Sequence, residues 1–229
     1  MGSNNTISFN QVWVKYGSKT VLRNLNFSVN QRKIGVIGLN ASGKSTAVRL
    51  LNGIVKVSEG QVLVHGIDPA KDPKAARQEV GFIFSNPDLQ IIMPTVFEDV
   101  KFSLRHSGLS KEQIKERTRA ALIKFGLLEV AEDPAHSLSG GQKQLLAICA
   151  IWVANPGLIV ADEPTALLDA YNARQVANLL LDELEQQVVL VTHDMSLAAR
   201  CDVVLRFENG RLEEIGEPDR VIANYLAAV

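Results

Sequence analysis

Residues 38–45 carry groups that could hold the phosphates of a nucleotide. They read Gly-Leu-Asn-Ala-Ser-Gly-Lys-Ser and satisfy the pattern G-x-x-x-x-G-K-[ST], after an apolar run at 34–37 and before a predicted helix at 46–51. In such a loop the backbone N–H groups turn toward phosphate oxygens, and the following helix presents its positive end to them. Lys44 is expected to bridge the β- and γ-phosphates, and Ser45 to bind Mg²⁺ through its hydroxyl group.

An acidic pair, Asp162 and Glu163, follows the apolar run at 158–161. Open α/β sheets bind ligands beyond the carboxyl ends of their strands, so this pair is expected at the nucleotide site. We predict that Asp162 helps to hold Mg²⁺ from outside its immediate coordination shell. Glu163 is expected to polarise the attacking water as general base, a role typically worth ~10²–10⁴-fold in rate. The alternative interpretation is a strand end whose acidic residues simply meet solvent.

A third segment, residues 138–142, reads Leu-Ser-Gly-Gly-Gln and precedes a predicted apolar helix at 144–153. Ser139, Gly140 and Gly141 at a helix start leave free N–H donors beside the positive helix end, which makes a second cradle for an anion. This cradle lies too far along the chain to duplicate the first loop for the same phosphate in the same subunit. A flexible Gly-Gly turn is the alternative interpretation.

Strands and helices alternate at both ends of the chain, with a helical block between them. Apolar and β-branched runs predict strands at 7–14, 21–29, 33–37, 61–65, 80–84, 158–161, 188–191 and 203–207. A capping box formed by Ser110 and Gln113 opens a charged helix in the middle block, and a further helix is predicted at 173–186. The pattern favours a parallel-sheet α/β core with an inserted helical subdomain.

With these three motifs in this order, the chain resembles the ATPase subunit of an ABC transporter over nearly its whole length. The resemblance implies an α/β fold of the P-loop NTPase class, with a RecA-like parallel-sheet core, an antiparallel β subdomain and an inserted helical subdomain. The nucleotide-binding core is expected at residues 1–86 and 144–229, and the helical subdomain with the signature segment at 87–143. The implied activity is hydrolysis of ATP with Mg²⁺.

The resemblance also implies roles for single residues. His193 would contact the γ-phosphate, Asp169 would lie along a dimer seam, and Tyr16 would stack on adenine, with Trp13 as its rival; such stacking is worth ~1–3 kcal/mol. The nucleotide-binding residues implied for the first loop are Gly38, Asn40, Ala41, Ser42, Gly43, Lys44, Ser45 and Thr46. The residues implied to grip ATP held by a second subunit, in a homodimer or heterodimer, are Ser139, Gly140, Gly141 and Gln142.

At one position the chain departs from the family. The strand predicted at 80–84 should be followed by a glutamine that reaches Mg²⁺, but Ser85 stands there. A serine hydroxyl cannot span the same gap without a bridging water, and Gln90 is not expected to substitute for the missing amide. Slower hydrolysis or looser coupling is the predicted result.

Residues 86–90, Asn-Pro-Asp-Leu-Gln, resemble an element of energy-coupling-factor importers. In these vitamin and transition-metal (cobalt, nickel) uptake systems, two ATPase subunits drive a transmembrane scaffold and a substrate-capture membrane protein. The chain ends soon after residue 215, which suggests a short member such as the biotin system. The alternatives are another ABC transporter, or a soluble ABC ATPase that acts as an assembly scaffold in iron–sulfur biogenesis.

Composition narrows the class of protein further. A net charge of −1 disfavours a dedicated nucleic-acid binder, so no nucleic-acid partner is expected. The longest candidate membrane span, residues 145–154, falls short of the ~20 apolar residues that a bilayer requires. We therefore expect a peripheral subunit on the cytoplasmic side of the cell membrane, bound there through its partners. Cys149 and Cys201 fit no disulfide or metal pattern and are expected to be reduced and buried.

Overall fold

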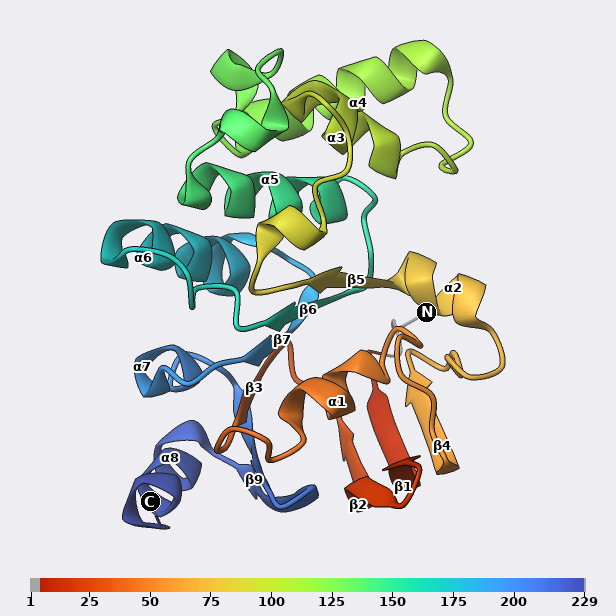
Figure 1. The fold of residues 1–229 in the computed structure, drawn as a ribbon, viewed down its shortest axis with the longest axis vertical. Helices are drawn as coiled ribbons and strands as arrows, with labels where there is room; N and C mark the ends of the chain where they lie inside the picture. The colour runs from red at the N-terminus through yellow and green to blue at the C-terminus, as the bar shows by residue number, and fades with distance from the viewer. Residues whose placement is uncertain (1–4, 229) are drawn as a thin grey trace.

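Two β-sheets of different kinds form the frame of the molecule, which the computed structural model describes from residue 5 to residue 228 (Figure 1). The smaller sheet is antiparallel and has the order β2 (Lys19–Val29), β1 (Ile7–Tyr16) and β4 (Glu59–Val64). In the larger sheet, with the order β5-β6-β7-β3-β8-β9, all neighbours are parallel except β8 and β9. Its strands are β3 (Lys33–Ile37), β5 (Val80–Ile83), β6 (Leu158–Asp162), β7 (Gln187–Val191), β8 (Val203–Glu208) and β9 (Arg211–Gly216).

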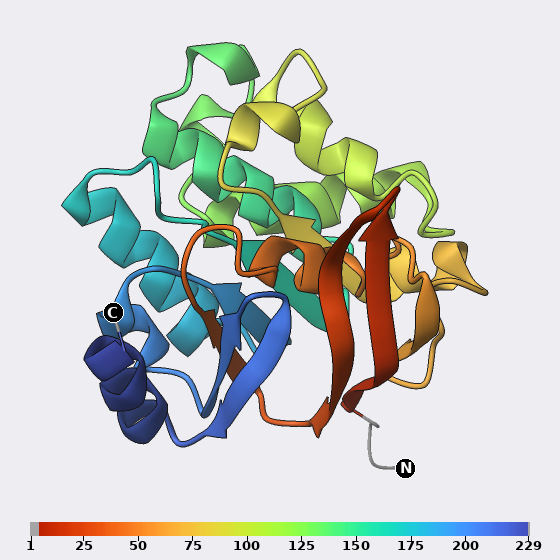
Figure 2. The ribbon, with the colours of Figure 1, turned by 60° about the horizontal axis from the view of Figure 1, so that its bottom comes forward.

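The central strands of the larger sheet are buried on both faces, as their continuous apolar runs predict. Every residue of β5, β6 and β7 is buried. One core fills the space between the two sheets and includes side chains of α1 (Lys44–Arg49). The other core lies on the opposite face of the larger sheet and includes side chains of the helices between residues 96 and 228. Figure 2 shows the antiparallel sheet standing beside α1 and the larger sheet. The two cores together fix the loop that joins β3 to α1.

Three helices form a separate layer at one end of the molecule, seen at the top of Figure 1: α3 (Val96–Ser103), α4 (Lys111–Lys124) and α5 (Gly140–Trp152). Ser110 and Gln113 form the predicted capping box, since each side chain accepts a hydrogen bond from the backbone N–H of the other residue. The other helices are α2 (Pro73–Glu79), α6 (Ala170–Asn178), α7 (Met195–Ala198) and α8 (Pro218–Ala228). Between residues 5 and 228, no helix has the length and apolar character needed to cross a membrane.

The helix predicted at 144–153 begins earlier than expected. Ser139 and Gln142 form a second capping box, with Ser139 N donating to Gln142 Oε1 at 3.0 Å and Gln142 N to Ser139 Oγ at 3.3 Å. This cap lets α5 start at Gly140, because two of the N–H groups at its first turn find partners. The subdomain boundary predicted after residue 143 therefore falls inside a helix.

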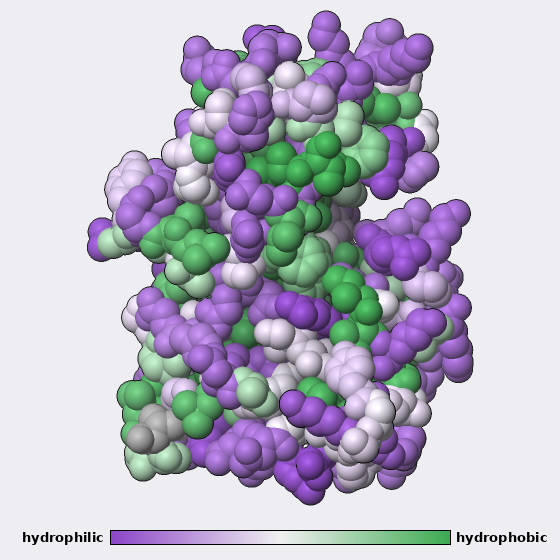
Figure 3. Space-filling model, viewed as in Figure 1, coloured by the Kyte–Doolittle hydropathy of each residue, from purple (hydrophilic) through white to green (hydrophobic). Residues whose placement is uncertain are grey.

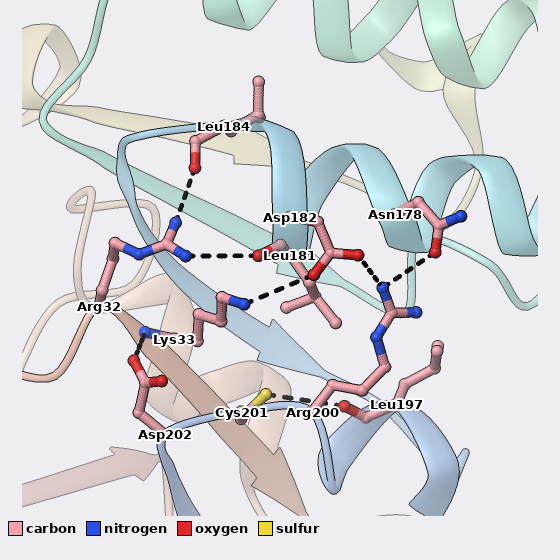
Figure 4. A network of polar contacts seen from close by, with 10 residues as sticks. All are labelled: Arg32, Lys33, Asn178, Leu181, Asp182, Leu184, Leu197, Arg200, Cys201 and Asp202. Atoms are coloured by element: carbon pink, nitrogen blue, oxygen red, sulfur yellow. Dashed lines mark hydrogen bonds and ion pairs between the residues drawn. The ribbon is translucent and has the colours of Figure 1, made fainter.

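The helix predicted at 173–186 also has different limits. α6 starts at Ala170 because the Asp169 carboxylate accepts hydrogen bonds from two backbone N–H groups of its first turn. Its last turn, Leu179–Glu183, is π-helical, and the chain is already extended at Leu184. Arg32, just before β3, donates to the carbonyl oxygens of Leu181 and Leu184 and so satisfies groups that the helix end leaves free (Figure 4).

The same π-helical turn is anchored by an ion-pair network, drawn in Figure 4. The Asp182 carboxylate lies 2.5 Å from Arg200 and 3.5 Å from Lys33. Arg200 donates in addition to the side chain of Asn178. The carboxyl end of α6 is thus tied to the start of β3 and to the segment before β8.

Both cysteines are buried and free, as predicted. Burial raises the pKa of the Cys149 thiol and of the Cys201 thiol to about 12. The neighbouring carboxylates Asp99 and Asp202 act in the same direction, because a negative charge disfavours a thiolate. Both sulfurs are therefore held as unreactive thiols.

Candidate functional site

The phosphate-binding loop lies between the carboxyl end of β3 and α1, in the context that the pattern requires. Two of its glycines have left-handed backbone angles, Gly38 with φ 145° and Gly43 with φ 104°. A Cβ atom on Gly38 would lie 2.2 Å from the carbonyl oxygen of Phe207, and one on Gly43 would lie 2.7 Å from the Leu22 side chain. Neither position has room for a side chain, so the loop can curl tightly against β8 and β2 only with glycine there.

A cleft of about 660 Å³ opens over this loop. Its walls are formed by residues 40–46 of the loop, by Glu163 and His193, and by three further segments at 19–21, 23 and 209–211. The volume is within the range of ~300–1,000 Å³ that is usual for small-ligand sites. The loop residues Asn40, Ala41, Ser42, Gly43, Lys44, Ser45 and Thr46, all predicted to bind nucleotide, line this cleft.

Lys44 is the cation at the base of the cleft. Its side chain is almost fully buried, and its Nζ donates to the carbonyl oxygens of Gly38 at 2.7 Å and Leu39 at 2.9 Å. Burial lowers the pKa of the Lys44 ammonium, and the nearby carboxylates of Glu163 and Asp162 oppose that shift. The two loop carbonyls hold the side chain within the loop, so a phosphate group that bound here would meet a positioned ammonium.

The predicted metal-binding oxygens lie next to each other. Ser45 Oγ donates to Asp162 Oδ1 at 3.0 Å, and Arg49 lies 3.2 Å from the second carboxylate oxygen of the buried Asp162. Hydroxyl and carboxylate oxygens are the hard donors that Mg²⁺ prefers, and it usually keeps several waters besides one or two protein ligands. A serine hydroxyl with a carboxylate behind it therefore fits a magnesium ion bound mainly by water and by a substrate phosphate.

Glu163 and His193 face each other across the carboxyl ends of β6 and β7. His193 Nε2 lies 3.0 Å from Glu163 Oε1, within ion-pair distance but not aligned as a hydrogen bond. Glu163 has a left-handed φ of 57°, which costs a non-glycine residue ~1–3 kcal/mol, and such strain tends to cluster at functional sites. Burial raises the pKa of the Glu163 carboxyl, against the opposing charge of Lys44, and burial lowers the pKa of His193. A carboxylate made more basic in this way is suited to accept a proton.

The signature segment, residues 138–142, contributes no residue to the walls of this cleft. Gly140 is exposed, and a Cβ atom there would meet no atom within 4 Å. Asp169, at the start of α6, is also exposed. Hydrogen bonds from the backbone N–H and side-chain amide of Asn172 lower the pKa of the Asp169 carboxyl, so this group stays ionised. The exposed start of α5 at Gly140 and the Asp169 carboxylate both lie outside the cleft, with space around Gly140. This arrangement is consistent with a site that a second subunit completes.

Comparison with known proteins agrees with the fold and with the motifs. The family described as "ABC transporter" matches residues 22–166. The chain belongs to the ABC transporter ATPase family. A biotin transport ATP-binding protein of Rhizobium etli is 40% identical over 219 residues, which cover 96% of this chain and 97% of that protein.

Two solved structures are similar in fold to this ABC ATPase. The first is cbiO1 from Clostridium perfringens, part of the ABC transporter complex cbiONQ, with a TM-score of 0.86 and 29% identity over 97% of this chain and 92% of that one. The second is the ATP-binding cassette MJ0796 in a dimeric post-hydrolysis state with ADP and Pi, with a TM-score of 0.79 and 26% identity over 93% and 98% of the chains. The ABC ATPase fold predicted from the sequence is confirmed, and the chain is an ATP-binding and ATP-hydrolysing enzyme.

Several walls of the cleft were not predicted from the sequence: Lys19, Thr20, Val21, Arg23, Asn209, Gly210 and Arg211. The Asn209-Gly210 turn joins β8 to β9. Gly210 N donates a hydrogen bond to the carbonyl oxygen of Ser42, and the carbonyl oxygen of Gly210 accepts one from Arg23 N. Asn-Gly between two apolar runs is a strong signal for a hairpin turn, and it could have identified the turn, although not its contact with the loop.

Besides residues 139–142 and Asp169, the predicted site residues that are absent from the cleft walls are Gly38, Asp162, Ser85 and Tyr16. Ser85 follows β5 and is partly buried, and Tyr16 is 55% exposed at the end of β1. Tyr16 pairs across the hairpin with Lys19, which does line the cleft. Tyr16 therefore lies next to one wall of the cleft, and its stacking on adenine stays a prediction.

Replacing Tyr16 with Ala is expected to weaken ATP binding about tenfold to a hundredfold, because a stacked base loses ~1–3 kcal/mol with its aromatic platform. Tyr16→Phe should bind ATP as the parent does, since it keeps the ring. Isothermal titration of ATP with both variants and with Trp13→Ala measures the effect. If Trp13→Ala weakens binding and Tyr16→Ala does not, Trp13 is the stacking residue.

Proposed function

We propose that this chain is the ATPase subunit of an energy-coupling-factor type importer that takes up a micronutrient, with biotin as the first candidate and cobalt or nickel ions as the second. The observation that carries the proposal is the 40% identity with the biotin transport protein over 97% of that protein's length. The match to cbiO1, which is part of a multi-subunit transporter complex, supports the same class. The Asn-Pro-Asp-Leu-Gln segment at 86–90 adds a local resemblance.

A second groove, which shares no wall residue with the cleft, would receive a transmembrane partner. It has a volume of about 1,090 Å³ and lies between α2, β5, the carboxyl end of α5 and the loop at 103–108. Figure 3 shows this hollow at the right-hand edge, between the helical layer above and α2 below. Apolar side chains including Ile54, Phe84 and Ile151 line it, and Lys74, Arg77 and Arg105 add positive charge. A helix with an apolar face and acidic flanks would fit these walls.

Apolar surface continues beside this groove, over the segment between β5 and α3 in the middle of Figure 3. Leu89 is 70% exposed and Ile92 is 63% exposed. The buried Asp99 carboxylate holds this segment by accepting hydrogen bonds from Ile92 N at 2.9 Å and Met93 N at 3.0 Å. Leu89 and Ile92 are thus exposed although hydrogen bonds hold the backbone of their segment in place. Exposed apolar side chains on an ordered segment support the view that a partner protein binds there. Such a partner would keep the subunit on the cytoplasmic side of the membrane.

For the reaction itself, we propose that two subunits enclose two ATP molecules in a head-to-tail dimer. Glu163 accepts a proton from the attacking water, and Lys44 and His193 stabilise the charge that develops on the transferred phosphoryl group. Ser139 and Gly140 of the second subunit complete the site from the other side. Magnesium, held near Ser45 and Asp162, would neutralise part of the phosphate charge.

The experiment that tests the importer function is co-purification. The tagged chain, expressed together with the membrane proteins encoded beside its gene, is expected to retain an integral membrane scaffold and a small capture protein in detergent. Binding of labelled biotin, cobalt and nickel to that complex then identifies the substrate. Purification with only soluble assembly proteins would favour the iron–sulfur scaffold alternative.

Ser85→Gln is expected to raise the ATPase activity of the assembled complex about threefold to tenfold. Serine needs an ordered water to bridge the gap to Mg²⁺, and immobilising such a water costs up to ~2 kcal/mol, whereas the longer amide of glutamine would reach without it. Gln90 does not fill this role, since its amide donates to Phe82 O at 2.9 Å and accepts from Phe84 N at 2.8 Å. Steady-state phosphate release measures the change, with Ser85→Ala as the matched control. Unchanged or lower activity in Ser85→Gln contradicts the prediction.

A further inference from the structure

The side chain of Asn172, in the first turn of α6, has a fixed orientation. Its Nδ2 donates to Asp169 Oδ2 at 2.6 Å, and Asp169 Oδ1 accepts from the backbone N–H groups of Tyr171 and Asn172 at 3.0 Å. An ionised carboxylate only accepts hydrogen bonds, so the amide nitrogen must face Asp169 and the amide oxygen must point the other way. The carboxylate of Asp169 therefore determines which atom of Asn172 lies against the neighbouring helix.

That neighbouring surface is Gly141 of the signature segment. A Cβ atom on Gly141 would lie 2.2 Å from Asn172 Oδ1 and 2.3 Å from its Cγ. Asn172 thus occupies the space that a side chain at position 141 would need. The adjacent Gly140 differs, because a Cβ atom there would meet nothing within 4 Å. The two glycines of the motif serve different purposes: Gly141 makes room inside the subunit, and Gly140 leaves an open surface.

The Asn172 amide consequently connects two exposed segments of one subunit. On one side is the start of α5, where Ser139 and Gln142 cap each other, and on the other is the Asp169 carboxylate at the start of α6. The partly negative amide oxygen also faces the positive end of α5, which favours this arrangement. A movement of α5 toward α6 would press on Asn172, because the two are already in contact at Gly141, and through its hydrogen bond it would press on Asp169.

We propose that Asn172 is a positioning residue that holds Asp169 and the segment 139–142 in a fixed relation, so that both meet the second subunit together. This inference rests on the ATP-dependent dimer of the proposed function. In the proposed dimer, Asn172 contacts neither ATP nor the second subunit. Its removal should therefore weaken ATP-driven association without weakening the binding of ATP by one subunit.

The first test uses Glu163→Gln as the parent, in which bound ATP should persist. Asn172→Ala, added to it, is expected to raise the ATP concentration needed for half-maximal dimer about tenfold, which is within the usual range of coupling between contacting residues. Asn172→Asp keeps the size of the side chain but sets a second carboxylate against Asp169, so a larger rise is expected. Light scattering after gel filtration measures dimer, titration measures ATP bound to the monomer, and thermal unfolding measures stability. The control is Glu183→Ala, an exposed position at the far end of the same helical segment.

The second test is a steric rescue. Gly141→Ala alone should impair dimer formation by at least about tenfold, because the added methyl group collides with Asn172. Gly141→Ala combined with Asn172→Ala should dimerise better than Gly141→Ala alone, although it carries one more substitution. Asn172→Ala should give no such rescue to Gly140→Ala, since Gly140 does not face Asn172.

The outcomes separate the inference from the function on which it rests. If the Glu163→Gln parent itself fails to dimerise with ATP, the proposed dimer is wrong and the inference falls with it. If the parent dimerises and Asn172→Ala dimerises equally well, only the inference is overturned. A loss of monomer ATP binding or of thermal stability in proportion to the loss of dimer also overturns it, because Asn172 would then act on folding alone.

Discussion

Replacing Glu163 with Gln is expected to lower ATP turnover ~10²–10⁴-fold, since an amide cannot accept the proton of the attacking water. Gln has nearly the same shape, so the strained backbone at φ 57° and the contact with His193 can persist. ATP should therefore bind normally and remain uncleaved, and dimer should accumulate. Phosphate release, ATP titration and gel filtration with light scattering measure the three effects.

The matched control for this substitution is Glu185→Gln, which makes the same chemical change at an exposed position. It should retain full turnover. Two results would count against the assignment of Glu163 as general base. One is turnover of Glu163→Gln within a few-fold of the parent; the other is a variant that stays monomeric at saturating ATP.

The second large effect concerns Lys44. Lys44→Ala removes the buried ammonium that two loop carbonyls position at the base of the cleft. A preorganised group that stabilises developing charge is typically worth ~10²–10³-fold in turnover, so activity should fall by at least this amount. Lys56→Ala, at an exposed position outside the loop, is the matched control. Phosphate release under saturating ATP measures the loss.

Mixing two inactive variants tests whether each ATP site is built from two subunits. Gly140→Asp should also be inactive, because the added carboxylate repels the phosphates of the ATP that the other subunit binds. The variant should still fold, since a Cβ atom at position 140 meets no atom within 4 Å. In a mixed dimer, the intact loop of the Gly140→Asp subunit would meet the intact signature of the Lys44→Ala subunit. Mixing the two inactive variants should therefore restore turnover. No recovery in mixtures that form dimers would contradict a site built from two subunits.

The parts of the site whose location could be predicted from the sequence are those in which one short segment determines the geometry. Residues 40–46 form the cleft because the glycines, the following helix and Lys44 are neighbours in the chain. The pairing of Ser45 with Asp162 could also be expected, because the carboxyl ends of parallel strands meet at one edge of the sheet.

The parts that could not be predicted depend on contacts between distant segments. The turn at Asn209 and Gly210 reaches the phosphate-binding loop because β8 pairs with β3. The local sequence of the turn does not indicate which strand will be the neighbour of β8. The π-helical turn at Leu179–Glu183 is capped by hydrogen bonds from Arg32, which comes from a segment far earlier in the chain. Likewise, the reason for glycine at position 141 is the side chain of Asn172, and the motif alone does not reveal it.

The state of the two cysteines has a practical consequence for watching this enzyme work. The chain contains only Cys149 and Cys201, and burial keeps both sulfurs protonated and out of reach of solvent. A maleimide fluorophore or spin label added to the unaltered chain should therefore leave it unmodified. One cysteine introduced at an exposed position, such as Glu183→Cys, could then be labelled alone, and the approach of two subunits could be followed as a distance in real time.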